Sequence, residues 1–318
     1  MIIIDKKDRK LLFELDKDAS ISLASLSKVL RCSKQTLAYR IKRLEKLGVI
    51  KGYKTVIDMS CLGFTTYRVY IKLQNADEEI RKSIFDFFRL QKNVWSVAIM
   101  QGRWNLAVFF GARGIPEMHT FFDRLMFSFR KQIKEYKLSI YQPVYFFARH
   151  FFLESKAEEN ELKYGLGERK DFDETDLKII EELKNNARVK NIDVAKKLVI
   201  SLDTVIRRRR RLERDGIISG YKLVLDYSKF GYTAYRVDFL LNDFSRKKQL
   251  FEYCKNHKNI YGVNDTIAGA DFEIALAAKD HYEFNSIIQE MLAEFKEMIN
   301  SYDYIGFSTF SFIEYIPD

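Results

Sequence analysis

Residues 33–47 alternate between apolar and polar positions with the period of an amphipathic helix. The apolar stripe consists of Leu37, Ile41, Leu44 and Leu47. Their spacing of i, i+4, i+7 and i+10 places them on one face, and the opposite face is cationic and hydrogen-bonding. Ser33 suits the amino-terminal cap and Gly48 suits the stop. The pattern predicts a helix with one buried side, and its polar side fits a DNA major groove.

Two shorter apolar periods come before this helix. Residues 5–18 and 22–30 each predict a helix, and a short break at residues 31–32 leads into the third. Three helices with a tight turn between the second and the third predict a helix-turn-helix. After Gly48, apolar positions alternate around Lys51-Gly52, as they would in the two strands of a small β-wing. A winged helix-turn-helix is therefore expected in the first part of the chain.

The next hundred residues change to strand-like and helical periods in turn. The expected strands are 65–73, 94–100, 106–110 and 140–152, and the expected helices are 78–90 and 116–131. The order β-α-β-β-α-β is that of a ferredoxin-like sandwich, four antiparallel strands covered by two helices. The aromatic residues concentrate here and are more typical of core or interface than of a cofactor site.

The whole pattern returns 168 positions later. Pairs in register include Ser33/Ser201, Thr36/Thr204, Arg40/Arg208, Arg43/Arg211, Gly52/Gly220, Tyr53/Tyr221 and Arg68/Arg236. A period this long indicates a duplicated domain pair rather than a solenoid. We expect an α+β chain of two tandem units, each a winged helix-turn-helix followed by a ferredoxin-like sandwich. The expected boundaries are 1–60, 61–153, a charged connector at 154–170, 171–228 and 229–318.

Charge and composition narrow the class of protein. The chain carries a formal charge of +10, and residues 31–54 hold eight Lys or Arg against one acid, Glu45. A solvated surface helix could carry such charges, but so one-sided a balance favours a polyanion partner. Three cysteines without metal spacing, and no apolar run long enough for a membrane, predict a soluble cytoplasmic protein without a cofactor.

The sequence resembles the Lrp/AsnC family of feast/famine regulators. The matching residues are Ile4-Asp5, Asp8-Arg9-Lys10-Leu11-Leu12, Asp18-Ala19-Ser20-Ile21-Ser22, Arg40-Ile41-Lys42-Arg43-Leu44-Glu45, Gly48-Val49-Ile50-Lys51-Gly52-Tyr53 and Ile57-Asp58. The resemblance covers essentially the whole chain, in two copies, whereas ordinary members carry one copy and dimerise. It implies a transcriptional regulator that binds double-stranded DNA and pairs its ferredoxin-like halves, within one chain or between two chains.

The resemblance also implies which residues contact DNA. Base edges would be contacted by the amino-terminal end of the third helix, and phosphates by its basic flank. The residues assigned to DNA in the first unit are Ser33, Lys34, Gln35, Thr36, Tyr39, Arg40, Lys42 and Arg43. Those assigned in the second unit are Ser201, Thr204, Arg207, Arg208, Arg210 and Arg211.

The second unit departs from the first within this helix. Leu202 and Asp203 replace Lys34 and Gln35, and Arg209 replaces Ile41 in the apolar stripe. A buried, unpaired guanidinium is costly, so Arg209 must reach solvent, find an acid such as Glu213 at i+4, or loosen the helix. Five consecutive arginines, 207–211, cannot all face DNA. We therefore hypothesise that the second unit binds the DNA backbone strongly and sequence weakly.

The ferredoxin-like half, which senses ligands in this family, also departs from the family pattern. The family's turn between the second and third sandwich strands tends to read Gly-x-Tyr-Asp, and amino-acid effectors bind near it. The candidate effector residues here are Gly102, Asn105, Gly269 and Asp271. Asn105 in place of a carboxylate weakens the case for binding an α-ammonium group. A tight hairpin would also require a glycine at each turn without any ligand.

Two other classes of function use the same architecture. Siroheme decarboxylases pair two Lrp-like subunits, and Asn105-Leu106 faintly resembles their sandwich motif. The second sandwich strands lack the histidine that this resemblance requires, and no metal, nucleophile-elbow or phosphate-loop motif is present. A non-enzymatic protein is therefore expected. An architectural DNA-compacting protein would use the same residues without sequence choice, and only binding data separate it from a regulator.

Overall fold

A computed structural model describes residues 4–153 and 161–311. The first unit consists of α1 (Lys6–Lys17), α2 (Leu23–Leu30), α3 (Lys34–Lys46), β1 (Ile50–Ile57), β2 (Thr65–Leu73), α4 (Glu78–Leu90), β3 (Val94–Gln101), β4 (Leu106–Ala112), α5 (Ile115–Phe129) and β5 (Ile133–Phe147). The connecting region holds η1 (His150–Phe152) and β6 (Glu161–Tyr164). The second unit consists of α6 (Glu174–Lys184), α7 (Asn191–Leu198), α8 (Leu202–Arg214), β7 (Ile218–Leu225), η2 (Tyr227–Phe230), β8 (Thr233–Leu241), α9 (Lys247–Asn256), β9 (Ile260–Ile267), β10 (Phe272–Ala278), α10 (His281–Glu294) and β11 (Ile299–Ser311).

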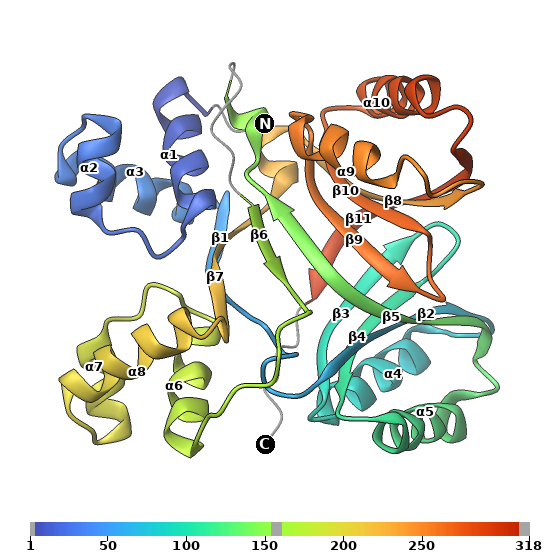
Figure 1. Cartoon of the computed structure of the whole chain (residues 1–318), viewed down its shortest axis with the longest axis horizontal. Helices are drawn as coiled ribbons and strands as arrows, with labels where there is room; N and C mark the ends of the chain where they lie inside the picture. The colour runs from blue at the N-terminus through green and yellow to red at the C-terminus, as the bar shows by residue number, and fades with distance from the viewer. Residues whose placement is uncertain (1–3, 154–160, 312–318) are drawn as a thin grey trace.

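The three helices that open the first unit match the predicted ranges to within one residue at each end. Ser33 caps α3, and Leu37, Ile41 and Leu44 are buried beneath it. Leu47 is the exception in the expected stripe, because it is the carboxy-terminal cap and its side chain is exposed. The two winged helices lie on one side of the molecule and the sheet lies on the other (Figure 1).

The predicted β-hairpin after α3 is wrong. Residues 50–57 form one strand, β1, which pairs antiparallel with β7 of the other unit, and Gly52 lies inside it opposite Val224. The residues that follow the first helix of each unit also contact the strand of the other unit: the Ala187 amide donates to the Tyr53 carbonyl (2.8 Å), and the Ala19 amide donates to the Tyr221 carbonyl (3.2 Å). Each strand therefore takes its partner from the other repeat, so no hairpin is needed.

The remaining strands form two ferredoxin-like sheets that join into one. Within the units the strand orders are β5-β2-β4-β3 and β11-β8-β10-β9. Pairing of β5 with β9 and of β3 with β11 joins the two sheets at both edges, which closes a ring (Figure 1). The helices α4, α5, α9 and α10 cover its outside. In this chain the sandwich halves pair with each other intramolecularly.

One expectation about the middle of the chain needs correction. The last strand of the first sandwich spans Ile133–Phe147, not 140–152, because residues 134–136 are all exposed and interrupt the alternation that marks a half-buried strand. The described part of the charged connector carries β6, which extends the sheet beside β5. The amide of Gly165, which follows β6, donates to Asp58 (3.0 Å). Residues 154–160 of the expected connector lie outside the described residues.

Candidate nucleic-acid interface

The amino-terminal ends of α3 and α8 have the same local geometry. Ser33 Oγ accepts from the Thr36 amide at 3.1 Å, and Ser201 Oγ accepts from the Thr204 amide at 3.1 Å. The hydroxyls of each pair also bond to each other, at 2.9 Å in the first unit and 2.8 Å in the second. Ser33 and Ser201 therefore cap their helices in the same way, each on a threonine three residues later, and the two units present the same backbone frame.

Two of the predicted phosphate contacts in the first unit point back into the protein. Arg40 pairs with Asp5 at 2.8 Å and with Asp8 at 2.7 Å, and Arg43 pairs with Asp8. Asp8 is fully buried and forms a capping box with Asp5 at the start of α1. The two arginines thus fasten α3 to α1, which sets the angle at which α3 projects.

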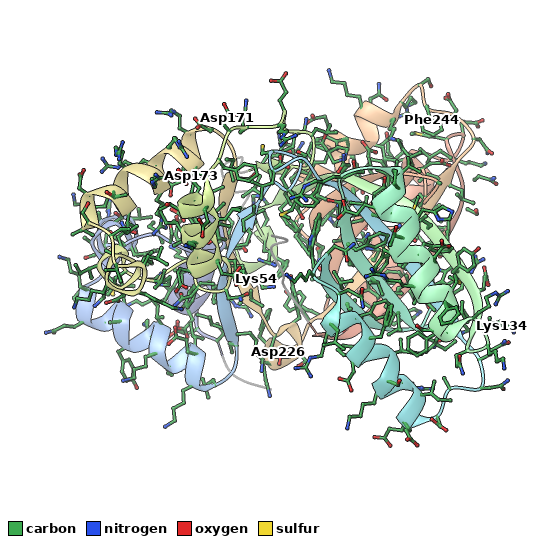
Figure 2. The ribbon with its side chains drawn as sticks, turned by 90° about the horizontal axis from the view of Figure 1, so that it is seen from below. Lys54, Lys134, Asp171, Asp173, Asp226 and Phe244 are labelled. Atoms are coloured by element: carbon green, nitrogen blue, oxygen red, sulfur yellow. The ribbon has the colours of Figure 1, made fainter. Side chains whose placement is uncertain are left out.

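The second unit repeats this arrangement. Arg208 pairs with Asp173 at 2.7 Å and with buried Asp176 at 3.0 Å, and Arg211 also pairs with Asp176. The hydrogen bond from Arg208 lowers the pKa of Asp173 to about 2, so this carboxylate stays charged in mild acid. Asp173 is the amino-terminal cap of α6 and is labelled in Figure 2. Of the arginines 207–211, Arg208 and Arg211 therefore fasten α8 to α6.

The outward faces of the two helices carry the other predicted DNA residues. In the first unit the exposed side chains are Lys34, Gln35, Tyr39 and Lys42. In the second unit the exposed predicted residues are Arg207 and Arg210, and Leu202 and Asp203, which the sequence did not assign to DNA, are exposed beside them. The helices α3 and α8 lie on either side of the β1–β7 pair, in the half of the molecule away from the large sheet (Figure 1).

Arg209 finds the acid that the sequence suggests. Its Nε donates to Glu213 at 3.2 Å and to the Tyr221 hydroxyl at 3.0 Å, and a terminal nitrogen donates to Asn191 at 3.1 Å. The guanidinium also lies over the Tyr221 ring. A polar network thus replaces the apolar contact of Ile41, and α8 remains a regular helix.

Comparisons with known proteins agree with this geometry. A family model described as winged helix-turn-helix DNA-binding matches residues 4–51 and 172–219. An HTH-type transcriptional regulator of Pyrococcus furiosus is 31% identical over 140 residues, which are 43% of this chain and 90% of that protein. The chain belongs to the Lrp/AsnC family of HTH-type transcriptional regulators. The proline dehydrogenase transcriptional activator of Rhodobacter capsulatus, 30% identical over 139 residues, is also similar, covering 42% of this chain and 89% of that one.

A solved structure resembles this Lrp/AsnC chain along nearly its whole length. It is the siroheme decarboxylase NirDL, at 14% identity and a TM-score of 0.62, covering 96% of this chain and 92% of that one. At this identity the likeness shows the fold alone. None of the four histidines lines either of the cavities described below. Among the helices that the structure describes, each is too short or too polar to span a bilayer.

The candidate effector residues of this family member are divided between its two sandwich turns. Asn105 Oδ1 accepts from the Leu73 amide at 2.8 Å, and Asp271 Oδ2 accepts from the Leu241 amide at 2.8 Å. Asn105 and Asp271 therefore occupy equivalent positions. The two candidate glycines do not, because Gly102 lies three residues before Asn105 and Gly269 lies two residues before Asp271. The counterpart of Gly102 (φ 126°) is Ala268 (φ 62°).

Both effector glycines have structural reasons to be glycine. The positive φ of Gly102 belongs to the β3–β4 turn. At Gly269 a Cβ would lie 2.2 Å from Thr266 Oγ1, so only glycine fits. Asn105 lines an open cavity of about 510 Å³, whose other residues are Lys72, Leu73, Gln74, Asn75, Ala76, Asp77 and Arg81. The other three candidates line neither this cavity nor the smaller one.

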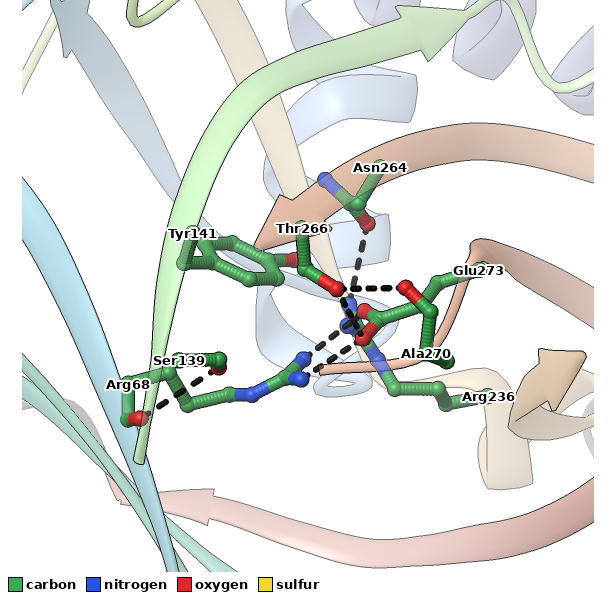
Figure 3. A network of polar contacts seen from close by, with 8 residues as sticks. All are labelled: Arg68, Ser139, Tyr141, Arg236, Asn264, Thr266, Ala270 and Glu273. Carbon is green, nitrogen blue, oxygen red and sulfur yellow. Dashed lines mark hydrogen bonds and ion pairs between the residues drawn. The ribbon is translucent and has the colours of Figure 1, made fainter. Parts of the chain in front are cut away.

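The interior of the ring holds a charged cluster. On β2, Tyr67, Val69 and Ile71 pack toward the helices, so strand alternation turns Arg68 and Tyr70 inward. Arg68 donates to Glu273 of β10 through two nitrogens, at 2.7 and 2.6 Å, and both side chains are fully buried (Figure 3).

The repeat-related arginine of β8 meets the same acid. Arg236 pairs with Glu273 and donates to Tyr141 at 2.6 Å and to Asn264 at 3.1 Å (Figure 3). Pairing registers set Glu273 opposite Asp238 in one unit and Ala107 opposite Tyr70 in the other. Ala107 therefore stands where the first unit would have its own glutamate, and a single carboxylate serves both arginines.

A second, smaller cavity of about 150 Å³ adjoins this cluster. It is lined by Tyr70, Arg103, Trp104, Lys137, Asp238, Leu240, Ala270, Ser301, Tyr302 and Asp303. Burial, with a further contribution from Glu273, raises the pKa of Asp238 to about 7. The folded chain therefore holds a proton that the unfolded chain releases near pH 4, and this lowers stability as the pH rises from about 4 to about 7.

Asp238→Asn is expected to remove this pH dependence. Asparagine has no charge to bury, so the variant should gain stability relative to the wild type at pH 8 and little at pH 4. Urea unfolding across this pH range measures the effect. Glu174→Gln, at an exposed pair with Lys178, is the control and should follow the wild-type profile. An unchanged pH slope in Asp238→Asn would contradict the assignment.

Two features of these sites escaped prediction from the sequence. The residue that ends the second helix, Arg31 in the first unit and Val199 in the second, adopts a left-handed conformation. It precedes the amino-terminal end of the third helix, which we call the reading end. In the sequence, this conformation was signalled only by a break in the apolar period before Ser33 and before Ser201. The Glu273 cluster was missed because its acid occurs in one unit alone, although the register of Arg68 with Arg236 marked its two cations.

Proposed function

We propose that the chain regulates transcription by placing α3 and α8 together on one duplex, as the two subunits of a family dimer would. The observation that carries this is the pair of identically capped helices on either side of β1–β7, both with exposed polar faces. One chain then supplies both DNA-binding elements, and its sandwich halves pair internally. A small-molecule effector such as an amino acid would act at the sandwich turns.

The exposure and pairing of the predicted DNA residues support different roles for them. Lys34, Gln35 and Tyr39 are exposed at the reading end of α3 and suit base edges. Lys42, with Arg207 and Arg210 of α8, suits the phosphates. Arg40, Arg43 and their counterparts in the second unit position the helices and contribute to DNA contact indirectly.

A gel-shift series with the chain's own upstream DNA and scrambled DNA, at several salt concentrations, tests this function. Preferential, salt-weakened binding to the upstream DNA is expected, since each phosphate contact releases counterions. Equal binding to both DNAs would favour an architectural protein. No binding to either would refute the proposal, and an absorbing tetrapyrrole in the preparation would then favour an enzyme.

Lys42→Ala should weaken binding to all sequences about equally. One lost phosphate contact lowers the slope of log affinity against log salt by about 1. Lys134→Ala is the matched control, because Lys134 is exposed on the sheet side, far from the winged helices (Figure 2). Equal slopes for Lys42→Ala and the wild type would rule out a phosphate contact at Lys42.

A further inference from the structure

The two reading ends differ in chemistry although their backbones match. The first unit presents Arg31, Lys34 and Gln35, and the second presents Val199, Leu202 and Asp203 at the equivalent positions. The capping bonds are the same in both units, and the second helix of each ends in the left-handed conformation, at φ 48° for Arg31 and 55° for Val199. The differences therefore change the contact surface and leave the frame alone.

The second reading end is apolar and acidic. Val199 is 89% exposed and Leu202 is 40% exposed, beside the exposed carboxylate of Asp203. A β-branched residue at positive φ is unusual, and nothing in the core requires Val199 to be apolar. Arg207 and Arg210 are exposed farther along α8 and keep this helix attractive to phosphates.

From this difference, and resting on the proposed function, we infer that the operator is a composite of two unlike half-sites. Lys34 suits guanine O6 and N7, and Gln35 suits adenine N6 and N7. Leu202 and Val199 suit the thymine methyl group, and Asp203 accepts from the cytosine amino group. The strand read by α3 carries purines where the strand read by α8 carries pyrimidines.

The single-chain architecture permits this asymmetry. A regulator made of two identical subunits presents two identical helices, so its operator mirrors its two-fold symmetry. Here both helices belong to one chain, and β1 pairs with β7 of the same chain. A substitution in one reading end therefore leaves the residues of the other reading end unchanged. On this inference the second unit discriminates bases as well as holding the backbone, which is an alternative to the hypothesis drawn from its sequence.

In vitro selection with the full chain from a randomised duplex library tests the inference. The selected site is then compared with two inverted repeats, one made of two α3 half-sites and one of two α8 half-sites. The wild type should prefer the composite by about five- to 150-fold for each base pair that an inverted repeat changes. Selection of an inverted repeat by the wild type, or of a site conserved in one half only, would overturn the inference.

Exchanging the reading ends supplies matched variants. V199R/L202K/D203Q gives the second unit the residues of the first, and R31V/K34L/Q35D makes the reverse change. The first variant should prefer the inverted repeat of α3 half-sites, and the second should prefer the repeat of α8 half-sites. The side chains at all the exchanged positions are exposed. Circular dichroism checks that both variants fold. A variant that keeps the composite preference would refute the assignment of these residues.

If the wild type binds no DNA in a salt-sensitive way, the proposed function itself fails. If it binds DNA and the exchanges do not alter its preference, only the composite operator fails. The two failures are therefore distinguishable in the same experiment.

Discussion

Replacing Glu273 by alanine is expected to lower the free energy of unfolding by about 3–5 kcal/mol, because it leaves two buried arginines without an acid. Arg68 and Glu273 are both fully buried, and Arg236 is nearly so. Removing the one carboxylate strands both guanidinium groups inside the ring. Since Arg68 belongs to the first unit and Glu273 to the second, the loss should loosen the joint between the units.

Denaturant unfolding followed by circular dichroism measures this effect. Glu174→Gln, at an exposed ion pair, is the control and should change stability by less than about 1 kcal/mol. The triple variant R68M/R236M/E273L replaces the cluster by apolar side chains and should recover most of the loss. A Glu273→Ala protein as stable as the wild type would contradict the buried-charge explanation, and failure of the triple variant would assign the loss to packing.

Acid should have a related effect. Although burial opposes it, attraction from Arg68 and Arg236 lowers the pKa of Glu273 below its ordinary value. This carboxylate therefore stabilises the fold above its unfolded pKa of about 4.3, and the contribution is lost as the pH falls through the lower folded value. Its pH window lies below that of Asp238, so unfolding measured across pH 2–8 separates the two.

Local patterns predicted most elements within each unit. Leu37, Ile41 and Leu44 repeat at helical spacing and are buried as expected, and Ser33 caps α3. The partner of β1 could not be read in the same way. Alternation over residues 49–57 indicates a strand. The same alternation would result whether this strand paired within a hairpin or, as observed, with the equivalent strand of the other unit. Closure of the ring depends on pairings between residues more than a hundred positions apart.

The candidate site was predicted in position and only partly in detail. Charge located the third helix, yet charge alone does not say which arginines face outward. Arg40 and Arg43 lie at the flank of the apolar stripe, where α1 brings Asp5 and Asp8 against them. The signal was present in the repeat, because Asp5 and Asp8 return as Asp173 and Asp176 at the same offset of 168. Which helices touch is a tertiary fact that neither spacing nor composition supplies.

Replacing Asp8 by alanine separates the two roles that these arginines could have. If Arg40 and Arg43 were phosphate ligands that Asp8 holds back, the variant would free both and bind DNA more tightly. The geometry points the other way. Asp8 is fully buried and takes part in the capping box of α1, so its loss removes the acid that Arg43 pairs with, leaves Arg40 with Asp5 alone and loosens α3 from α1. We expect a local loss of about 3–5 kcal/mol.

Hydrogen exchange and gel shifts measure the two consequences together. Amides of α1 and α3 should exchange faster in Asp8→Ala, and affinity for the upstream DNA should fall by more than about tenfold, because α3 no longer projects at a fixed angle. Asp176→Ala makes the matched change in the second unit and should affect α6 and α8 while leaving α1 and α3 protected. Tighter DNA binding by either variant would restore the arginines to the phosphate-contacting set. Weaker binding with faster exchange confined to the altered unit would support a positioning role for Arg40 and Arg43, since two freed phosphate ligands would by themselves strengthen binding to a polyanion.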